Sequence, residues 1–513
     1  MSSHHQKQRS SLTVQAFWLL IAKTLGFIFA FALPILLTRS LSQNEYGIFK
    51  QVFLVITTAT ALLPLGFAMS AFYYLPRESE PTRRGQVVLN ILLFNLIVGA
   101  AACLILVLWP GVIAMIFKDP SLPSYASLIG LVIPLWLFSS FVETVAVANQ
   151  ELRLATVFIV AGQLTRTLLL FAAAIVFDTV QALVYAALIH GTLQSIVLMW
   201  YVSSRFPGFW RAFDWSLTRR QVAYALPLGL AGLLFTIQTD LHNYFVSNRF
   251  SPATFAVYSI GVAQLPFVGI VRESVSSVIL PRISYLQQEG QVREIIILVA
   301  NATRKLAAVF LPAYAFLMIT GREFLTVMFT KAYVMSWPIF AINLTLLPLA
   351  LIEVDAVVRA YEKHRYFLLK LQIVLSVFMV FALSYGISHF GLMGAIGVVV
   401  LINFLLRGVL AIKFSSVLGA QPRDLLLFKD VAKIALASAG AGLICLFVRS
   451  IAIASVSRPL VILIICFTVF SAVYMAAILL LAVPSRDERE KVRQQLSRLQ
   501  QFVYLGNSAN SVS

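Results

Sequence analysis

Long apolar segments, separated by short polar loops, run along almost the whole chain. A helix needs about 20 consecutive apolar residues to cross the hydrocarbon core of a membrane. Segments of this length predict transmembrane helices at residues 13–38, 46–75, 86–108, 124–149, 154–177, 180–203, 221–248, 253–281, 294–320, 333–359, 366–389, 392–412, 430–450 and 459–483. The sequence therefore predicts an all-α polytopic membrane protein with about fourteen spans.

Composition supports this class and argues against an enzyme. Of 513 residues, 60% are hydrophobic and only 12% are charged, whereas a soluble domain keeps roughly a quarter of its residues charged. The loops are too short for a soluble catalytic domain, and the chain has no GxxxxGK[ST] phosphate loop. Cys103, Cys445 and Cys466 fall in apolar segments without metal-ligand spacing. We therefore expect no catalytic residues, no cofactor and no metal site.

Two pairs of similar segments indicate that the chain contains two related halves. Residues 39–49 join the first two predicted helices, and residues 249–258 join the seventh and eighth. Residues 142–153 and 354–365 form a second pair at nearly the same separation. Related halves in one membrane chain are typical of transporters whose substrate site lies between the halves.

The first repeated loop has the chemistry of a helix start in both copies. Ser42 and Glu45 have the spacing of a capping box. Ser251 precedes Pro252, and proline suits the first turn of a helix. A structural role as helix caps explains these residues better than contact with a substrate.

The repeat predicts five parts of the chain. They are an N-terminal six-helix lobe at 1–205, a cytoplasmic linker at 206–220, a C-terminal six-helix lobe at 221–417, two further transmembrane helices at 418–483 and a cytoplasmic amphipathic tail at 484–513.

Basic residues are distributed unevenly between the two sides of the membrane. If the N-terminus is cytoplasmic, the loops on that side carry twenty-two lysines and arginines. The other side has only Arg39, Lys118, Arg249, Arg322, Lys331, Arg449 and Arg458. Because basic loops stay in the cytoplasm, both termini are predicted to be cytoplasmic. The net charge of +18 is dispersed over loops that contact anionic lipids, so we expect membrane lipids and no nucleic acid as partners.

The turn at residues 39–49 reads Arg-x-Leu-Ser-x-x-Glu-Tyr-Gly-x-Phe, and a second segment runs from Gly321 to Phe329, followed by Tyr333. With these motifs the chain resembles the polysaccharide-transport branch of the multidrug/oligosaccharidyl-lipid/polysaccharide exporter superfamily, the Wzx-like oligosaccharide flippases. The second copy of the turn departs from this pattern, because Phe255-Ala-Val-Tyr replaces Tyr-Gly.

The resemblance implies both an architecture and a function. Two six-helix lobes would form a V around a central cavity, and helices thirteen and fourteen would either hold the polyprenyl tail or pack peripherally. The cargo would be an undecaprenyl-diphosphate-linked oligosaccharide, the repeat unit of O-antigen, capsule or exopolysaccharide. Alternating access would move it from the inner to the outer leaflet of a bacterial cytoplasmic membrane, with a polymerase and glycosyltransferases as partners.

Basic side chains inside the predicted spans are the candidate substrate ligands. A charge at the bilayer centre costs about 2.5–3.5 kcal/mol unless a partner or a wet cavity receives it. Lys23 and Arg272 lie in helices that flank the cavity of the resembled fold, where they would hold the diphosphate. Pairing with an acid on a neighbouring helix explains these two equally well. Arg166 and Arg407 are further candidates, although pairing is favoured for both.

The acidic and imidazole side chains in the spans are candidates for ion coupling. Asp240, close to His242 in the seventh predicted helix, is the first choice for a proton or cation site. Glu273 is a further candidate. For Glu143 and Asp355, near the ends of their helices, a structural role is favoured.

Proline, glycine and glutamine add polarity to three spans. Pro64-Leu-Gly66, Pro227-Leu-Gly229 and Pro266 predict kinks in the second, seventh and eighth helices. Gln238 and Gln264 are candidates for hydrogen bonds to sugar hydroxyls, and hydrogen bonding between helices is the alternative.

Two other functions fit parts of the sequence. A drug or metabolite:cation antiporter of the same superfamily would favour an acid in the lining helices of the first half, whereas the first predicted helix offers Lys23. A membrane glycosyltransferase or polymerase would need acids on a long outside segment, whereas the first outside loop has only Glu45, which is assigned to a cap.

Overall fold

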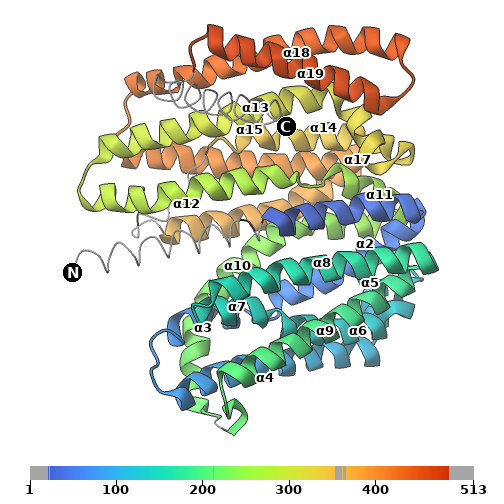
Figure 1. Cartoon of the computed structure of the whole chain (residues 1–513), viewed down its shortest axis with the longest axis vertical. Helices are drawn as coiled ribbons and strands as arrows, with labels where there is room; N and C mark the ends of the chain where they lie inside the picture. Colours follow the sequence, from blue (N-terminus) through green and yellow to red (C-terminus); the bar gives the residue numbers. More distant parts are fainter. Residues whose placement is uncertain are drawn as a thin grey trace, which may run out of the picture. The chain divides into compact units, whose positions relative to one another are not determined.

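The computed structural model describes residues 21, 24–211, 213–352, 357, 361 and 365–483. Every regular element within these residues is a helix (Figure 1). Nine of the described helices are long and apolar enough to cross a membrane, or up to twelve if each of three bent pairs is one span. The prediction of an all-helical polytopic membrane protein is confirmed.

The first half of the described chain begins with an apolar helix at Thr24–Ser40. The elements that follow are α2 (Gln43–Leu62), η1 (Phe67–Met69), α3 (Ser70–Tyr74), α4 (Pro81–Leu108), α5 (Gly111–Phe117), η2 (Leu122–Tyr125), α6 (Ala126–Ser139), α7 (Phe141–Ala148), α8 (Leu152–Phe177), α9 (Val180–Arg205), η3 (Phe209–Arg211), α10 (Trp215–Arg249) and α11 (Pro252–Gly261).

The later elements include the two longest helices of the described chain. They are α12 (Pro266–Gln288), α13 (Val292–Phe329), η4 (Lys331–Ser336), α14 (Trp337–Leu344), α15 (Leu346–Leu349), α17 (Arg365–Val417), η6 (Pro422–Phe428), α18 (Lys429–Ser455) and α19 (Pro459–Leu480).

The number fourteen stays a prediction. Part of the first predicted helix and most of residues 353–364, with Asp355, lie outside the described residues. The helix α17 is interrupted at Gly391, which has φ 57° and ψ −135°, between the predicted helices at 366–389 and 392–412. The end predicted at residue 320 is wrong, because α13 continues to Phe329 through an apolar run that carries only two charged residues.

All three predicted kinks are confirmed. The bend between α2 and the helices η1 and α3 is 43°, the bend within α10 is 51°, and the bend between α11 and α12 is 43°. Gly66 adopts φ 69°, a left-handed conformation that glycine tolerates at no steric cost. The first two kinks touch: a Cβ atom built at Gly229 would lie 1.8 Å from the carbonyl oxygen of Leu65. Glycine is therefore required where these two backbones meet.

The predicted helix caps are confirmed as well. The Ser42 hydroxyl accepts from the backbone N–H of Glu45, whose carboxylate accepts from the backbone N–H of Ser42 at 3.0 Å. Ser251 accepts from the N–H of Thr254 at the start of α11. The two repeated loops therefore start α2 and α11 in the same way.

The chain divides into two compact units. The first comprises residues 1–273, 325–343 and 362–410, and the second comprises 274–324, 344–361 and 411–513. The division into two six-helix lobes, which the repeat predicts, stays a prediction.

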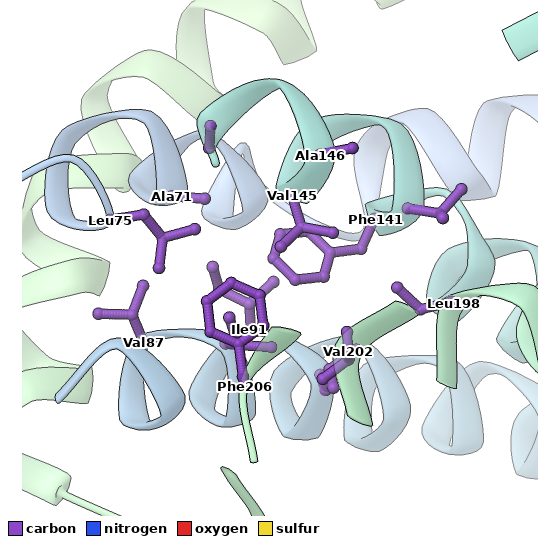
Figure 2. Packing of buried hydrophobic residues seen from close by; sticks show 14 of the residues in the cluster. Ala71, Leu75, Val87, Ile91, Phe141, Val145, Ala146, Leu198, Val202 and Phe206 are labelled. Atoms are coloured by element: carbon purple, nitrogen blue, oxygen red, sulfur yellow. The ribbon is translucent and has the colours of Figure 1, made fainter. Parts of the chain in front are cut away.

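A large apolar core of the first unit joins α3, α4, α7 and α9. Leu75, Ile91, Val145, Val202 and Phe206 are almost completely buried in this core. Figure 2 shows their side chains converging from α4, α7, α9 and the end of α3. Burial of each large apolar side chain stabilises the fold by roughly 1.5–3 kcal/mol. Because the core also includes Phe158 of α8, it holds α7 beside α8.

The second unit is held together by α13, α18 and α19. The guanidinium of Arg449 on α18 donates to both carboxylate oxygens of Glu323 on α13, at 2.8 and 3.1 Å. The Tyr474 hydroxyl on α19 donates to the carbonyl oxygen of Ala308 at 2.9 Å. The free thiol of Cys445 is buried against α19, as expected for a packing residue. The two C-terminal helices thus pack on α13.

Candidate functional site

A cavity of about 310 Å³ lies among four helices of the first unit. Its size falls at the lower end of the roughly 300–1,000 Å³ typical of ligand sites. The lining comes from the N-terminal helix, α7, α8 and α12. Its residues are Thr24, Gly26, Phe27, Ala30, Glu143, Ile159, Gln163, Ile270 and Glu273. This is the candidate functional site.

Two polar side chains of the cavity have no partner in the described protein. Glu143 on α7 is exposed to the cavity and forms no ion pair or hydrogen bond with a described residue, and the same holds for the amide of Gln163 on α8. Polar groups in a membrane-spanning region require a partner or water. Water or a bound molecule must therefore satisfy them.

A basic cluster lies farther along α8 from this cavity. We define it as Lys50 on α2, Arg166 on α8 and His190 on α9, of which Arg166 and His190 contact Trp136 on α6. The guanidinium of Arg166 lies over the Trp136 ring, 4.6 Å from its centroid, and the His190 ring meets Trp136 edge-on at 5.9 Å. Lys50 and Arg166 are close enough to repel each other electrostatically.

The two cations of this cluster have no acidic partner among the described residues. Neither Lys50 nor Arg166 forms an ion pair with any carboxylate of the described residues, and the Nε atom of Arg166 is buried without a hydrogen-bond acceptor. Among the described residues, the Lys50 ammonium lies 5.6 Å from the centre of the Tyr46 ring, and the Arg166 guanidinium lies over the Trp136 ring. Cation–π contacts stabilise by about 0.5–2 kcal/mol, less than a buried cation costs without further partners. The cluster is therefore suited to bind an anion.

The cavity and the basic cluster are adjacent along α8. Gln163 and Arg166 are three residues apart, and residues at this spacing occupy neighbouring positions on one helix face. A molecule whose uncharged part lies beside Gln163 and whose anionic part lies beside Arg166 would fit this arrangement along α8.

The other predicted basic residues are placed as follows. Lys23 lies outside the described residues, next to the cavity residue Thr24. Arg272 is half-buried on α12, beside the cavity residue Glu273. Arg407 is half-buried on α17 and does not line the cavity.

The predicted glutamines differ from each other. The Gln238 amide nitrogen donates to the carbonyl oxygen of Gln372 and to the hydroxyl of Ser376 on α17, each at 2.9 Å. It thus makes the interhelical hydrogen bonds that the sequence offered as the alternative to sugar binding. Gln264 is exposed in the break between α11 and α12, and it does not line the cavity.

The predicted coupling residues on α10 face different helices. The Thr58 hydroxyl on α2 donates to the Asp240 carboxylate at 3.3 Å. His242 is buried, and its Nδ1 atom lies 2.8 Å from the Tyr258 hydroxyl on α11. Residues two apart on a helix point about 200° apart, so this pair is not one site.

Lys50 and Gln163 were not among the predicted site residues, and Glu143 was interpreted as structural. Each is polar or charged within an apolar segment, which was the available signal. That none of them hydrogen-bonds to a described residue becomes visible only when neighbouring helices are in place.

The fold of the described residues is that of a polytopic membrane protein. The chain belongs to a family of polysaccharide biosynthesis proteins, whose sequence profile matches residues 36–338. No curated protein matches it.

Several solved transporters share the fold. The lipid II flippase MurJ in an inward closed conformation is similar with a TM-score of 0.70 and 14% identity, covering 91% of this chain and 98% of that chain. An inward-facing multidrug resistance MATE family transporter of the MOP superfamily gives 0.58 and 15%, covering 78% and 95%. The MATE multidrug transporter DinF-BH gives 0.54 and 15%, covering 80% and 96%. At these identities the similarity establishes a MurJ/MATE-like fold.

Proposed function

We propose that the chain is a flippase that moves undecaprenyl-diphosphate-linked oligosaccharide from the inner to the outer leaflet of a bacterial cytoplasmic membrane by alternating access. The observation that carries this proposal is the basic cluster, two cations within membrane-spanning helices that no described carboxylate neutralises. A diphosphate head would supply the missing charge, with a guanidinium gripping its oxygens bidentately. Membership of a polysaccharide biosynthesis family supports a glycan as cargo.

The proposed architecture has fourteen spans, two six-helix lobes and cytoplasmic termini. The up to twelve spans of the described residues support it, together with the break at Gly391 and the apolar helix Thr24–Ser40, because these would add one span each. Within it, Lys23 and Arg272 stay candidates for the diphosphate, beside the cavity on the N-terminal helix and on α12. Asp240 stays the candidate for ion coupling.

A specific observation favours a second function. Glu143, from the first half of the chain, lines the cavity. An acid there would suit a drug or metabolite:cation antiporter, in which protonation of the carboxylate alternates with binding of a cationic substrate. The basic cluster argues against this alternative, because it would repel a cation.

Complementation of a bacterial host whose surface glycan depends on this chain tests the proposal. We expect Lys50→Gln or Arg166→Gln to reduce surface glycan at least about tenfold, because a charge-assisted hydrogen bond contributes roughly 1.5–3 kcal/mol. Lys23→Ala and Arg272→Ala are expected to have the same effect.

The control is Lys305→Ala, which removes an exposed lysine of α13 and should leave surface glycan unchanged. An immunoblot of the membrane fraction checks that each variant is present. Normal glycan display by both Lys50→Gln and Arg166→Gln would contradict the proposal.

A further inference from the structure

The cavity has an acidic character that the diphosphate cannot explain. Its described lining residues include two carboxylates, Glu143 and Glu273, and no lysine, arginine or histidine. Of the two acids, Glu143 has no partner in the described part of the protein. The Glu143 carboxylate would repel a phosphate head placed against it, so a different part of the cargo would occupy the cavity and the diphosphate would lie beside it.

The remaining polar lining has the chemistry of a sugar site. Carboxylate and amide oxygens accept hydrogen bonds from hydroxyl groups, and the amide nitrogen of Gln163 donates to hydroxyl oxygens. The exposed ring of Phe27 and the side chain of Ile159 provide an apolar wall against which the C–H face of a pyranose ring packs. Ligand sites generally combine such apolar walls with a few polar groups that orient the ligand.

The sign of the cavity's charge discriminates between sugars. A uronic acid would bring its own carboxylate next to Glu143 in a partly enclosed space, where like charges repel more strongly than in water. A neutral sugar meets no such repulsion, and the ammonium group of an amino sugar would be attracted.

The same arrangement accommodates the charged head of the cargo. Arg166 follows Gln163 by one helical turn, so a sugar beside Gln163 places its diphosphate toward the basic cluster. The cavity carries negative side chains and the basic cluster carries positive ones. The first therefore suits the hydroxyl groups of a sugar, and the second suits the anionic diphosphate.

We propose that this cavity binds the sugar attached to the lipid diphosphate and selects neutral or amino sugars against acidic ones. This inference rests on the proposed flippase function. Glu143 and Glu273 are then specificity-determining residues, and Gln163 orients the sugar.

Binding measurements with the full chain in lipid nanodiscs test this selection. The probes are polyprenyl diphosphate carrying one glucose, the same lipid carrying one glucuronic acid, and polyprenyl diphosphate without sugar. We expect the glucose probe to bind at least about tenfold more tightly than the glucuronic acid probe. In the double variant Glu143→Gln/Glu273→Gln, the ratio should fall to about two or less through tighter binding of the glucuronic acid probe.

A matched control and distinct outcomes separate this inference from the proposed function. Glu289→Gln removes an exposed carboxylate beyond the end of α12 and should keep the wild-type ratio. Equal affinities for the two sugar probes in the wild type would overturn the selection and leave the flippase proposal standing, as would a ratio that the double variant does not change. Absence of binding by all three probes would instead overturn the flippase proposal.

Discussion

The helices α8 and α10 both carry polar side chains through apolar surroundings, but they differ in what those side chains contact. On α8, Gln163 has no hydrogen-bond partner in the described protein, and the guanidinium of Arg166 lies over an aromatic ring with no acceptor for its Nε atom among the described residues. On α10, each of several polar residues is engaged by a neighbouring helix. These residues are Gln221, Gln238, Asp240, His242 and Ser247.

This difference separates a scaffold from a binding surface. A polar group in a membrane span that is bonded to another helix holds the fold together. A polar group without a protein partner needs water or cargo, and it is the better indicator of function. We therefore interpret α8 as part of the route of the cargo and α10 as mainly structural, with Asp240 as the proposed coupling residue to be tested.

Gly229→Ala tests the packing of α10 and should have the largest effect on stability. The added Cβ would lie 1.8 Å from the carbonyl oxygen of Leu65, and backbone cannot move aside as a flexible side chain can. Overpacking of this kind costs about 3 kcal/mol. Thermal unfolding of the purified protein in detergent measures it. Gly232→Ala, three residues along the same helix with open space around it, is the control and should unfold like the wild type.

Replacing one glutamine on each helix compares the two directly. Gln221 is fully buried; it accepts from the amide of Asn90 at 2.9 Å and donates to the hydroxyl of Ser70 at 3.1 Å. Gln221→Leu leaves both groups unpaired and should lower the free energy of unfolding by about 2 kcal/mol. Gln163→Leu breaks no protein hydrogen bond and should leave stability within about 0.5 kcal/mol, while reducing surface glycan.

The same unfolding and glycan assays decide this comparison. If Gln163→Leu destabilised the protein as much as Gln221→Leu, Gln163 would have a protein partner, and the interpretation of α8 would be wrong.

Asp240→Asn should have only a small effect on stability. The amide oxygen of asparagine still accepts the hydrogen bond from Thr58, so the free energy of unfolding should change by less than about 1 kcal/mol. If Asp240 couples transport to an ion, this variant should abolish the proton or sodium dependence of transport in vesicles. An unchanged ion dependence would exclude Asp240 as the coupling residue.

Much of the fold was predictable because membrane insertion imposes simple rules. The spans follow from apolar length, since a helix satisfies its own backbone groups in lipid. Proline and glycine correctly predicted the bends at Gly66, Gly229 and Pro266. The capping serines correctly predicted the starts of α2 and α11. The end of α13 was missed because apolar residues continue past residue 320.

The site was less predictable because the tertiary structure decides which polar side chains find a hydrogen-bond or ion-pair partner on another helix. The sequence could not distinguish Gln238, which is bonded to α17, from Gln163, which has no partner in the described protein. It also favoured pairing for Arg166, whereas its described neighbours are the Trp136 ring and another cation, Lys50. Glu143 was interpreted as structural from its position near a helix end, yet it lines the cavity.

The central claim is that Lys50 and Arg166 bind an anionic lipid head. Translocation by the purified chain in proteoliposomes tests this claim most directly. The substrate is a fluorescent polyprenyl diphosphate that carries one glucose, and a membrane-impermeant quencher reports its arrival in the outer leaflet. We predict that the wild-type chain moves the lipid and that Lys50→Gln/Arg166→Gln slows this movement at least about tenfold, with Lys305→Ala as the unaffected control. Wild-type translocation by the double variant would contradict the account.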